Sequence, residues 1–92
     1  MDLETFKNLE APLNTFSPEL KSLWYDLKGN WDLAHDQVDQ LEGKSAARIH
    51  AYLHRKEGDQ WNADYWYRRA GEKRPSLTLD QEWLELFDRY NS

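Results

Sequence analysis

The side chains best suited to metal chemistry are His50 and His54, in the stretch HAYLH. Residues four positions apart lie on one face of a helix, and two imidazoles with this spacing are a common pair of zinc ligands. A third ligand could come from His35, Asp36 or Glu57. One hypothesis for this chain is therefore a metal-dependent enzyme that uses His50 and His54.

The same two histidines also fit a structural role. The metalloprotease motif with this spacing has a glutamate directly after its first histidine, as general base, and Ala51 occupies that position here. A half-buried histidine that makes one hydrogen bond explains the pattern as well. No glycine-rich phosphate loop or nucleophile elbow is present. We therefore predict no catalytic residue, no metal ligand and no cofactor, with His50 and His54 as the alternative metal candidates.

The charge of the chain is divided unevenly. The sequence of 92 residues has a net charge of −5, but residues 44–74 contain eight Lys or Arg and four Asp or Glu. Acidic outer helices could neutralise this basic middle, or the basic middle could bind an anionic partner. Nucleic acid is not expected, because most of the chain would repel phosphate.

The composition indicates one small intracellular domain. The chain has no cysteine, which suits a reducing compartment. Its N-terminus has no apolar signal region, and no window approaches the roughly 20 apolar residues of a membrane span. We expect a cytoplasmic protein that does not bind membranes.

Start and stop signals predict five or six short helices. Ser17 and Pro18 begin one helix, Gly29 ends it, and Thr78 with Gln81 forms a capping box. No segment alternates with the period of a strand, so the chain is predicted to be all-α. The expected helices span residues 17–28, 31–42, 45–57, 60–70 and 78–90, with a shorter one at 3–10, and Asn30, Ser45 and Asp59 as further caps.

Two segments of the chain resemble each other with a period of 29 residues. They are GNWDLAHDQVDQL, from Gly29, and GDQWNADYWYRRA, from Gly58. Each has a glycine, a capping Asn or Asp, and then apolar residues at matching places. Periods of this size are typical of stacked helical hairpins. In the second segment, the positions expected in the core are Ala63, Trp66, Tyr67 and Ala70.

This pattern resembles the tetratricopeptide repeat and its Sel1-like relative, whose hairpins have about 34 residues. The family's Ala, Phe, Ala and Pro positions hold Ala63, Tyr67, Ala70 and Pro75, and the first copy has Ala34, Val38 and Leu41. The small-residue positions of the first helix hold Ser22 and Ala51. Its Trp and Leu positions depart from the family and hold Pro18 and Lys21, then Ala47 and His50. HAYLHRKEGD and YWYRRAG also resemble short bacterial proteins of uncharacterised role.

The resemblance covers about residues 17–75 and implies antiparallel helical hairpins within a single domain of residues 1–92. Two tetratricopeptide-like repeats, at about 17–43 and 44–75, would be flanked by capping helices. The C-terminal cap, at about 78–90, is expected to turn Trp83, Phe87 and Tyr90 inward and Glu82, Glu85 and Asp88 outward.

The family resemblance also implies a binding function. First helices of such hairpins line a groove, where this chain would place Arg48, Tyr52, Arg55 and Lys56. Arg beside an aromatic ring suits a carboxylate, so the expected partner is a protein with an acidic or C-terminal peptide segment. In the alternative, these side chains pair with Asp36, Asp39 and Glu42. A second alternative is a self-associating structural protein, which would form a homodimer over uncovered apolar surface.

Overall fold

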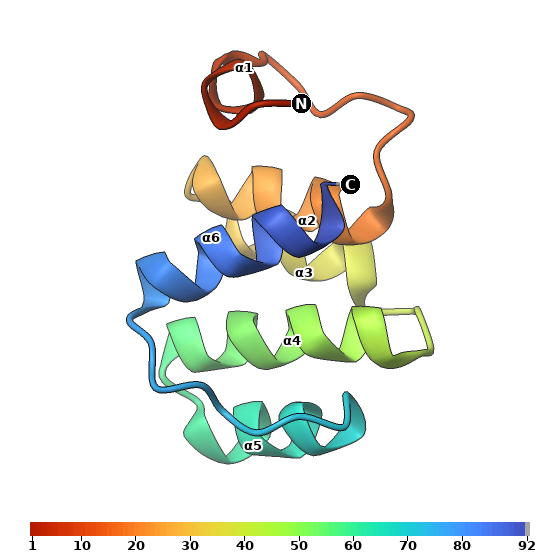
Figure 1. The fold of residues 1–92 in the computed structure, drawn as a ribbon. Coiled ribbons are helices and arrows are strands. Elements are labelled where there is room, and N and C mark those ends of the chain that lie inside the picture. The colour runs from red at the N-terminus through yellow and green to blue at the C-terminus, as the bar shows by residue number, and fades with distance from the viewer. Residues whose placement is uncertain (92) are drawn as a thin grey trace.

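The computed structural model describes residues 1–91 and contains six α-helices, with no strand in that range (Figure 1). This confirms the all-α prediction. The helices are α1 (Leu3–Asn8), α2 (Pro18–Leu27), α3 (Trp31–Val38), α4 (Lys44–Glu57), α5 (Gln60–Arg69) and α6 (Leu79–Tyr90). None of them, within the described residues, is long and apolar enough to cross a membrane.

The capping signals of the sequence position most helix starts. Ser17 Oγ accepts a hydrogen bond from the Leu20 amide at 3.2 Å, and Thr78 and Gln81 form the expected reciprocal capping box. The helix expected from Ser45 begins one residue earlier, because Gly43 with φ of 106° takes the N-cap position and no side chain caps this end. Both α2 and α5 end on a left-handed or tightly turned residue followed by the loop that the glycines predicted.

The third helix is shorter than expected. The sequence predicted a helix to residue 42, but α3 ends at Val38. Leu41 was expected on its apolar stripe, yet its residue is 39% exposed. Because no neighbouring helix covers Leu41, a further turn of α3 would bury no apolar surface, and the chain instead turns toward α4.

The helices pack in an order that places α6 over the middle of the molecule. Along the chain, α2 packs against α3, α3 against α4, and α4 against α5. The last helix then returns across α2 and α4, while α1 contacts α2 beside the N-terminus (Figure 1). The main core lies between these helices and contains Phe6, Leu20, Leu23, Trp24, Ala34, Val38, Ala46, Ile49, Tyr52, Leu53, Trp83, Leu86 and Phe87.

Aromatic side chains fasten α6 into this core. The Trp83 indole N–H donates to the Leu23 carbonyl of α2 at 3.1 Å, and its ring stacks on Phe87. Phe6 of α1 contacts Phe87 edge-on, with 4.9 Å between ring centroids. Trp83 and Phe87 are buried, as expected, whereas Tyr90 is partly buried. The C-terminal helix is therefore an integral part of the core.

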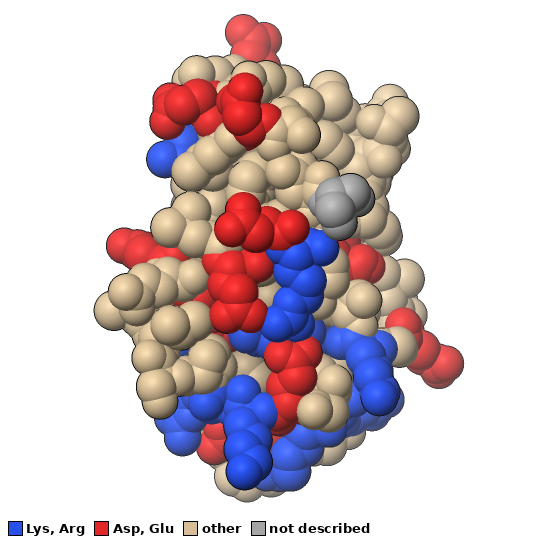
Figure 2. Space-filling model, in the orientation of Figure 1, with Lys and Arg blue, Asp and Glu red and all other residues tan. Residues whose placement is uncertain are grey.

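Charged side chains follow the division seen in the sequence. Figure 2 shows Lys and Arg gathered over the part of the molecule where α4 and α5 lie, with Asp and Glu interleaved among them. Acidic groups dominate the visible surface toward α1 and α6. This arrangement brings opposite charges together along the contact between α4 and α6.

Candidate binding face and histidine cluster

The predicted basic face of α4 is largely covered by the chain itself. Arg48 is 1% exposed, and its Nε donates to Glu72 Oε1 at 3.2 Å. Its Nη1 lies 2.8 Å from Glu82 Oε2, although without the geometry of a hydrogen bond. Arg55 Nη1 donates to Glu82 Oε1 at 2.7 Å, and its Nη2 donates to the Leu77 carbonyl at 2.6 Å. Both guanidinium groups are thus held by residues 72–82.

Glu82 is the centre of this network. It was expected to point outward, but it is fully buried. The reason is that Arg48 and Arg55 both face it, and the Tyr67 hydroxyl donates to its Oε2 at 2.5 Å. A buried carboxylate is tolerable when it is paired and hydrogen-bonded in this way. Burial, with the hydrogen bond to Glu82, raises the pKa of Tyr67.

Tyr52 and Lys56 meet a second acid, Asp26 of α2. The Tyr52 hydroxyl donates to Asp26 Oδ2 at 2.7 Å, and Lys56 Nζ donates to Asp26 Oδ1 at 2.8 Å. Burial, together with the charge of Asp26, raises the pKa of Tyr52. Tyr52 is 2% exposed, whereas the Lys56 side chain is 39% exposed. Of the four predicted contact residues, Lys56 is therefore the most accessible.

The intramolecular partners differ from those expected. The alternative prediction paired the basic face with the α3 side, through Asp36, Asp39 and Glu42. The ion pairs instead reach Asp26, Glu72 and Glu82. The basic face of α4 turns toward α2 and α6, so the acids after α3 are out of its reach. The excess of acid near the C-terminus was the only sequence signal for this contact, and it gave no position.

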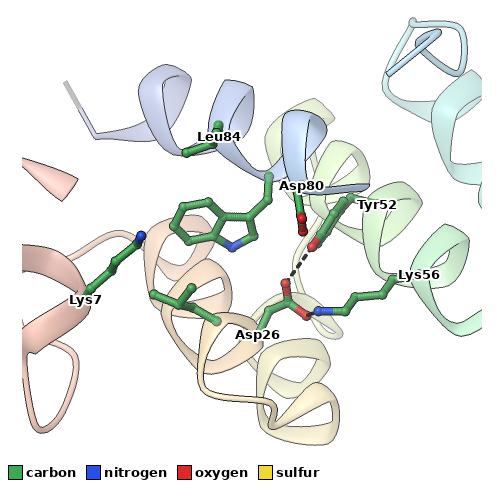
Figure 3. A pocket seen from close by; sticks show the side chains of 8 residues that line it. Lys7, Asp26, Tyr52, Lys56, Asp80 and Leu84 are labelled. Atoms are coloured by element: carbon green, nitrogen blue, oxygen red, sulfur yellow. Dashed lines mark hydrogen bonds and ion pairs between the residues drawn. The ribbon is translucent and has the colours of Figure 1, made fainter. Parts of the chain in front are cut away.

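An open cleft remains beside the covered face. It has a volume of about 410 Å³ and lies among α1, α2, α4 and α6. Figure 3 shows Lys7 reaching toward it from α1, with Asp26, Tyr52, Lys56 and Asp80 grouped on the opposite side. Its apolar wall is formed by Leu27, Trp83 and Leu84. The cleft combines an apolar floor with cationic groups at its margin.

The three histidines of the chain lie together on the other side of α4. One ring nitrogen from each of His35, His50 and His54 falls within 4.8 Å of the other two. The two α4 histidines stack with 6.0 Å between ring centroids, and His35 of α3 meets both edge-on, at 5.0 and 5.4 Å. Of the three candidate third ligands, His35 joins the pair directly, while Glu57 contacts His54 and Asp36 is not in the cluster.

Each α4 histidine is buried and has a partner for one nitrogen. His50 Nε2 lies 3.1 Å from the Val38 carbonyl, and His54 Nδ1 lies 2.6 Å from Glu57 Oε2. Burial lowers the pKa of His50, so its imidazole is neutral at pH 7. Trp66 stacks on His50, with 4.1 Å between ring centroids. This agrees with the expectation of buried histidines that each make one hydrogen bond.

Comparison with protein-family models, with the sequences of curated proteins and with solved structures gives no match for this chain. The functional argument therefore rests on the residues and the geometry alone.

Proposed function

We propose that this chain is a small non-catalytic interaction module that binds an acidic or C-terminal segment of a partner protein. The observation that carries the proposal is the cleft of about 410 Å³ bordered by Tyr52 and Lys56, two of the residues predicted to contact a peptide. The site would be this cleft, and the covered residues Arg48 and Arg55 would support it from beneath α6. No reacting group is required for this function.

The cleft suits a segment in which an apolar side chain lies next to a carboxylate. Leu27, Trp83 and Leu84 offer the apolar contact, and Leu84 is 43% exposed. Within residues 1–91, Lys7 has no ion pair, so its ammonium group is free to meet the carboxylate of a ligand. Lys56 could contribute from the other margin while it keeps its contact with Asp26.

The charge balance of the cleft restricts where the carboxylate can lie. Lys56 and Asp26 already neutralise each other at 2.8 Å, and Asp80 adds a negative charge near Tyr52 (Figure 3). Carboxylate binding is therefore favoured at the Lys7 end and opposed at the Asp80 end. Both effects are surface electrostatics, so peptide binding should weaken as salt is added.

The proposal includes two tetratricopeptide-like hairpins, α2 with α3 and α4 with α5. Supporting this, Ser22 donates to the Ala34 carbonyl at 2.8 Å between α2 and α3, and Ala51 packs with Ala63 between α4 and α5. The second pair follows the first by the same 29 residues that separate the glycines. In such an arrangement α2 and α4 line one face, where α6 occupies most of the groove and leaves the cleft open.

The chain supplies its own acidic ligand for this face. Glu82 of α6 occupies the position in front of Arg48 and Arg55 that the sequence assigned to a partner carboxylate. This supports the proposed preference for acidic segments. It also explains why an external peptide would use Lys7 and Lys56 at the edge, since displacing α6 would expose buried Trp83, Leu86 and Phe87.

The test is fluorescence anisotropy with a labelled peptide, Glu-Asp-Leu-Glu-Asp-Leu, bearing a free C-terminal carboxylate. We expect saturable binding that the Lys7→Met variant weakens by about tenfold, the range of one charge-assisted contact. Lys73→Met is the matched control, because Lys73 is exposed and lies outside the cleft. Equal loss in both variants would indicate non-specific attraction, and absence of saturable binding would contradict the proposal.

A further inference from the structure

We propose that His35, His50 and His54 form a binding site for a single Zn²⁺ ion. This inference is independent of the peptide cleft, which lies on another face of α4. The chain contains three histidines, and the fold brings all three into one cluster from two helices. Zinc is the common divalent ion that imidazole ligands suit best, and three histidines with an open fourth position form a known zinc coordination set.

The hydrogen bonds of His50 leave one of its nitrogens available to a metal. Its Nε2 faces the Val38 carbonyl at 3.1 Å, and a carbonyl can only accept, so this nitrogen carries the proton. The lone pair is then on Nδ1, which is buried and has no hydrogen-bond partner among residues 1–91. A buried polar atom without a partner is uncommon, and a bound metal is one explanation of it.

His54 has the outer partner that zinc-binding histidines usually have. Its Nδ1 lies 2.6 Å from Glu57 Oε2, and this carboxylate keeps the proton on Nδ1 and the lone pair on Nε2. Histidine ligands commonly donate their second N–H to a carboxylate or a carbonyl, which orients the ring and increases its basicity. His54 with Glu57 and His50 with Val38 show both forms of this arrangement.

The separation of the rings is close to what a zinc ion requires. Bonds of 2.0–2.1 Å in tetrahedral geometry place ligand nitrogens about 3.3 Å apart. The three nitrogens here lie within 4.8 Å, so they must approach by up to about 1.5 Å. His35 is the side chain best able to move, because it is 21% exposed and its contact with Asp39 is long, at 3.8 Å.

The surroundings favour a closed and oriented site. The Trp31 ring stacks on His35 at 5.0 Å, and its indole N–H donates to the Leu53 carbonyl at 2.8 Å, which ties α3 to α4. The Trp66 ring covers His50. Apolar walls of this kind limit access of water from those sides, while the exposure of His35 leaves a path for the ion.

The test is isothermal titration of the metal-free protein with Zn²⁺, and with Mg²⁺ as an ion that prefers oxygen ligands. We expect one Zn²⁺ per chain and no saturable binding of Mg²⁺. His35→Ala should weaken Zn²⁺ binding more than about 100-fold, since it removes a direct ligand. Circular dichroism would check that this partly exposed variant stays folded. Absence of saturable Zn²⁺ binding, or binding unchanged in His35→Ala, would overturn the proposal.

Two further variants separate this site from its neighbour. Glu57→Gln should weaken Zn²⁺ binding by about 10–100-fold, the usual effect of removing an outer carboxylate. His54, Glu57 and Asp59 form a second, mostly exposed group of potential ligands. Asp59→Asn keeps an N-cap for α5 and should leave Zn²⁺ binding unchanged. If Asp59→Asn weakens binding and His35→Ala does not, the ion belongs to that second group and the three-histidine site is wrong.

Discussion

Replacing Glu82 with glutamine should destabilise the protein more than any other single charge neutralisation in α6. The Glu82 side chain is fully buried and contacts Arg48, Arg55 and Tyr67 at 2.8, 2.7 and 2.5 Å. The substitution keeps the shape of the side chain but leaves Arg48, which is 1% exposed, with Glu72 as its remaining charged partner. Breaking a buried ion pair on one side costs about 3–5 kcal/mol.

We expect a loss of about 3 kcal/mol for Glu82→Gln, at the lower end of that range, because the amide can still accept one hydrogen bond. A domain of this size has a free energy of unfolding of about 5–14 kcal/mol, so the change is large. Urea unfolding followed by Trp fluorescence measures it. With a slope of about 1–3 kcal/mol per molar urea, the midpoint should fall by about 1–3 M.

The matched control is Glu85→Gln, three residues further along α6. Glu85 accepts from Arg89 at 2.6 Å, but both side chains are well exposed, so the loss should stay below about 1 kcal/mol. The Arg55→Met and Glu82→Gln changes should be less than additive when combined, because they break the same contact. A loss below about 1 kcal/mol in Glu82→Gln would refute the claim that this carboxylate holds α6 to α4.

Two other outcomes follow from buried polar groups. The raised pKa values of Tyr52 and Tyr67 mean that stability present below pH of about 10 is lost as pH rises above it, because the unfolded chain releases these protons first; alkaline unfolding curves should show this slope, reduced in Tyr67→Phe, and a stability independent of pH above 10 would contradict it. Ser22→Leu should destabilise by about 1–3 kcal/mol through overpacking between α2 and α3, whereas Ser22→Ala should cost about 1 kcal/mol, measured by thermal unfolding; equal effects of the two substitutions would argue against close packing there.

Local signals in the sequence predicted the helices well. Ser17 and Thr78 cap their helices because each offers a side-chain oxygen to amide groups within three residues. The apolar stripe of α6 also identified Trp83 and Phe87 as buried residues. These features depend on neighbours a few positions away, so the sequence contains what is needed to predict them.

The position of α6 could not be predicted in the same way. Glu82 has the sequence context of an exposed residue in the first turn of a helix, where acids are common. Its burial depends on Arg48 and Arg55, which lie more than 25 residues earlier in the chain. Likewise, His50 and His54 are recognisable from their spacing, but nothing local selects His35 as the third member of the cluster. Such contacts are set by tertiary packing.

The most direct test of the proposed function is to map the peptide on the protein by NMR. Amide signals of the ¹⁵N-labelled chain would be followed while the unlabelled peptide Glu-Asp-Leu-Glu-Asp-Leu is added. We predict shifts that are concentrated at the cleft, at Lys7, Leu27 and Leu84, and that saturate together. Shifts confined to the exposed side of α5, around Trp61, or no saturable shifts at all, would contradict the assignment of this cleft as a peptide-binding site.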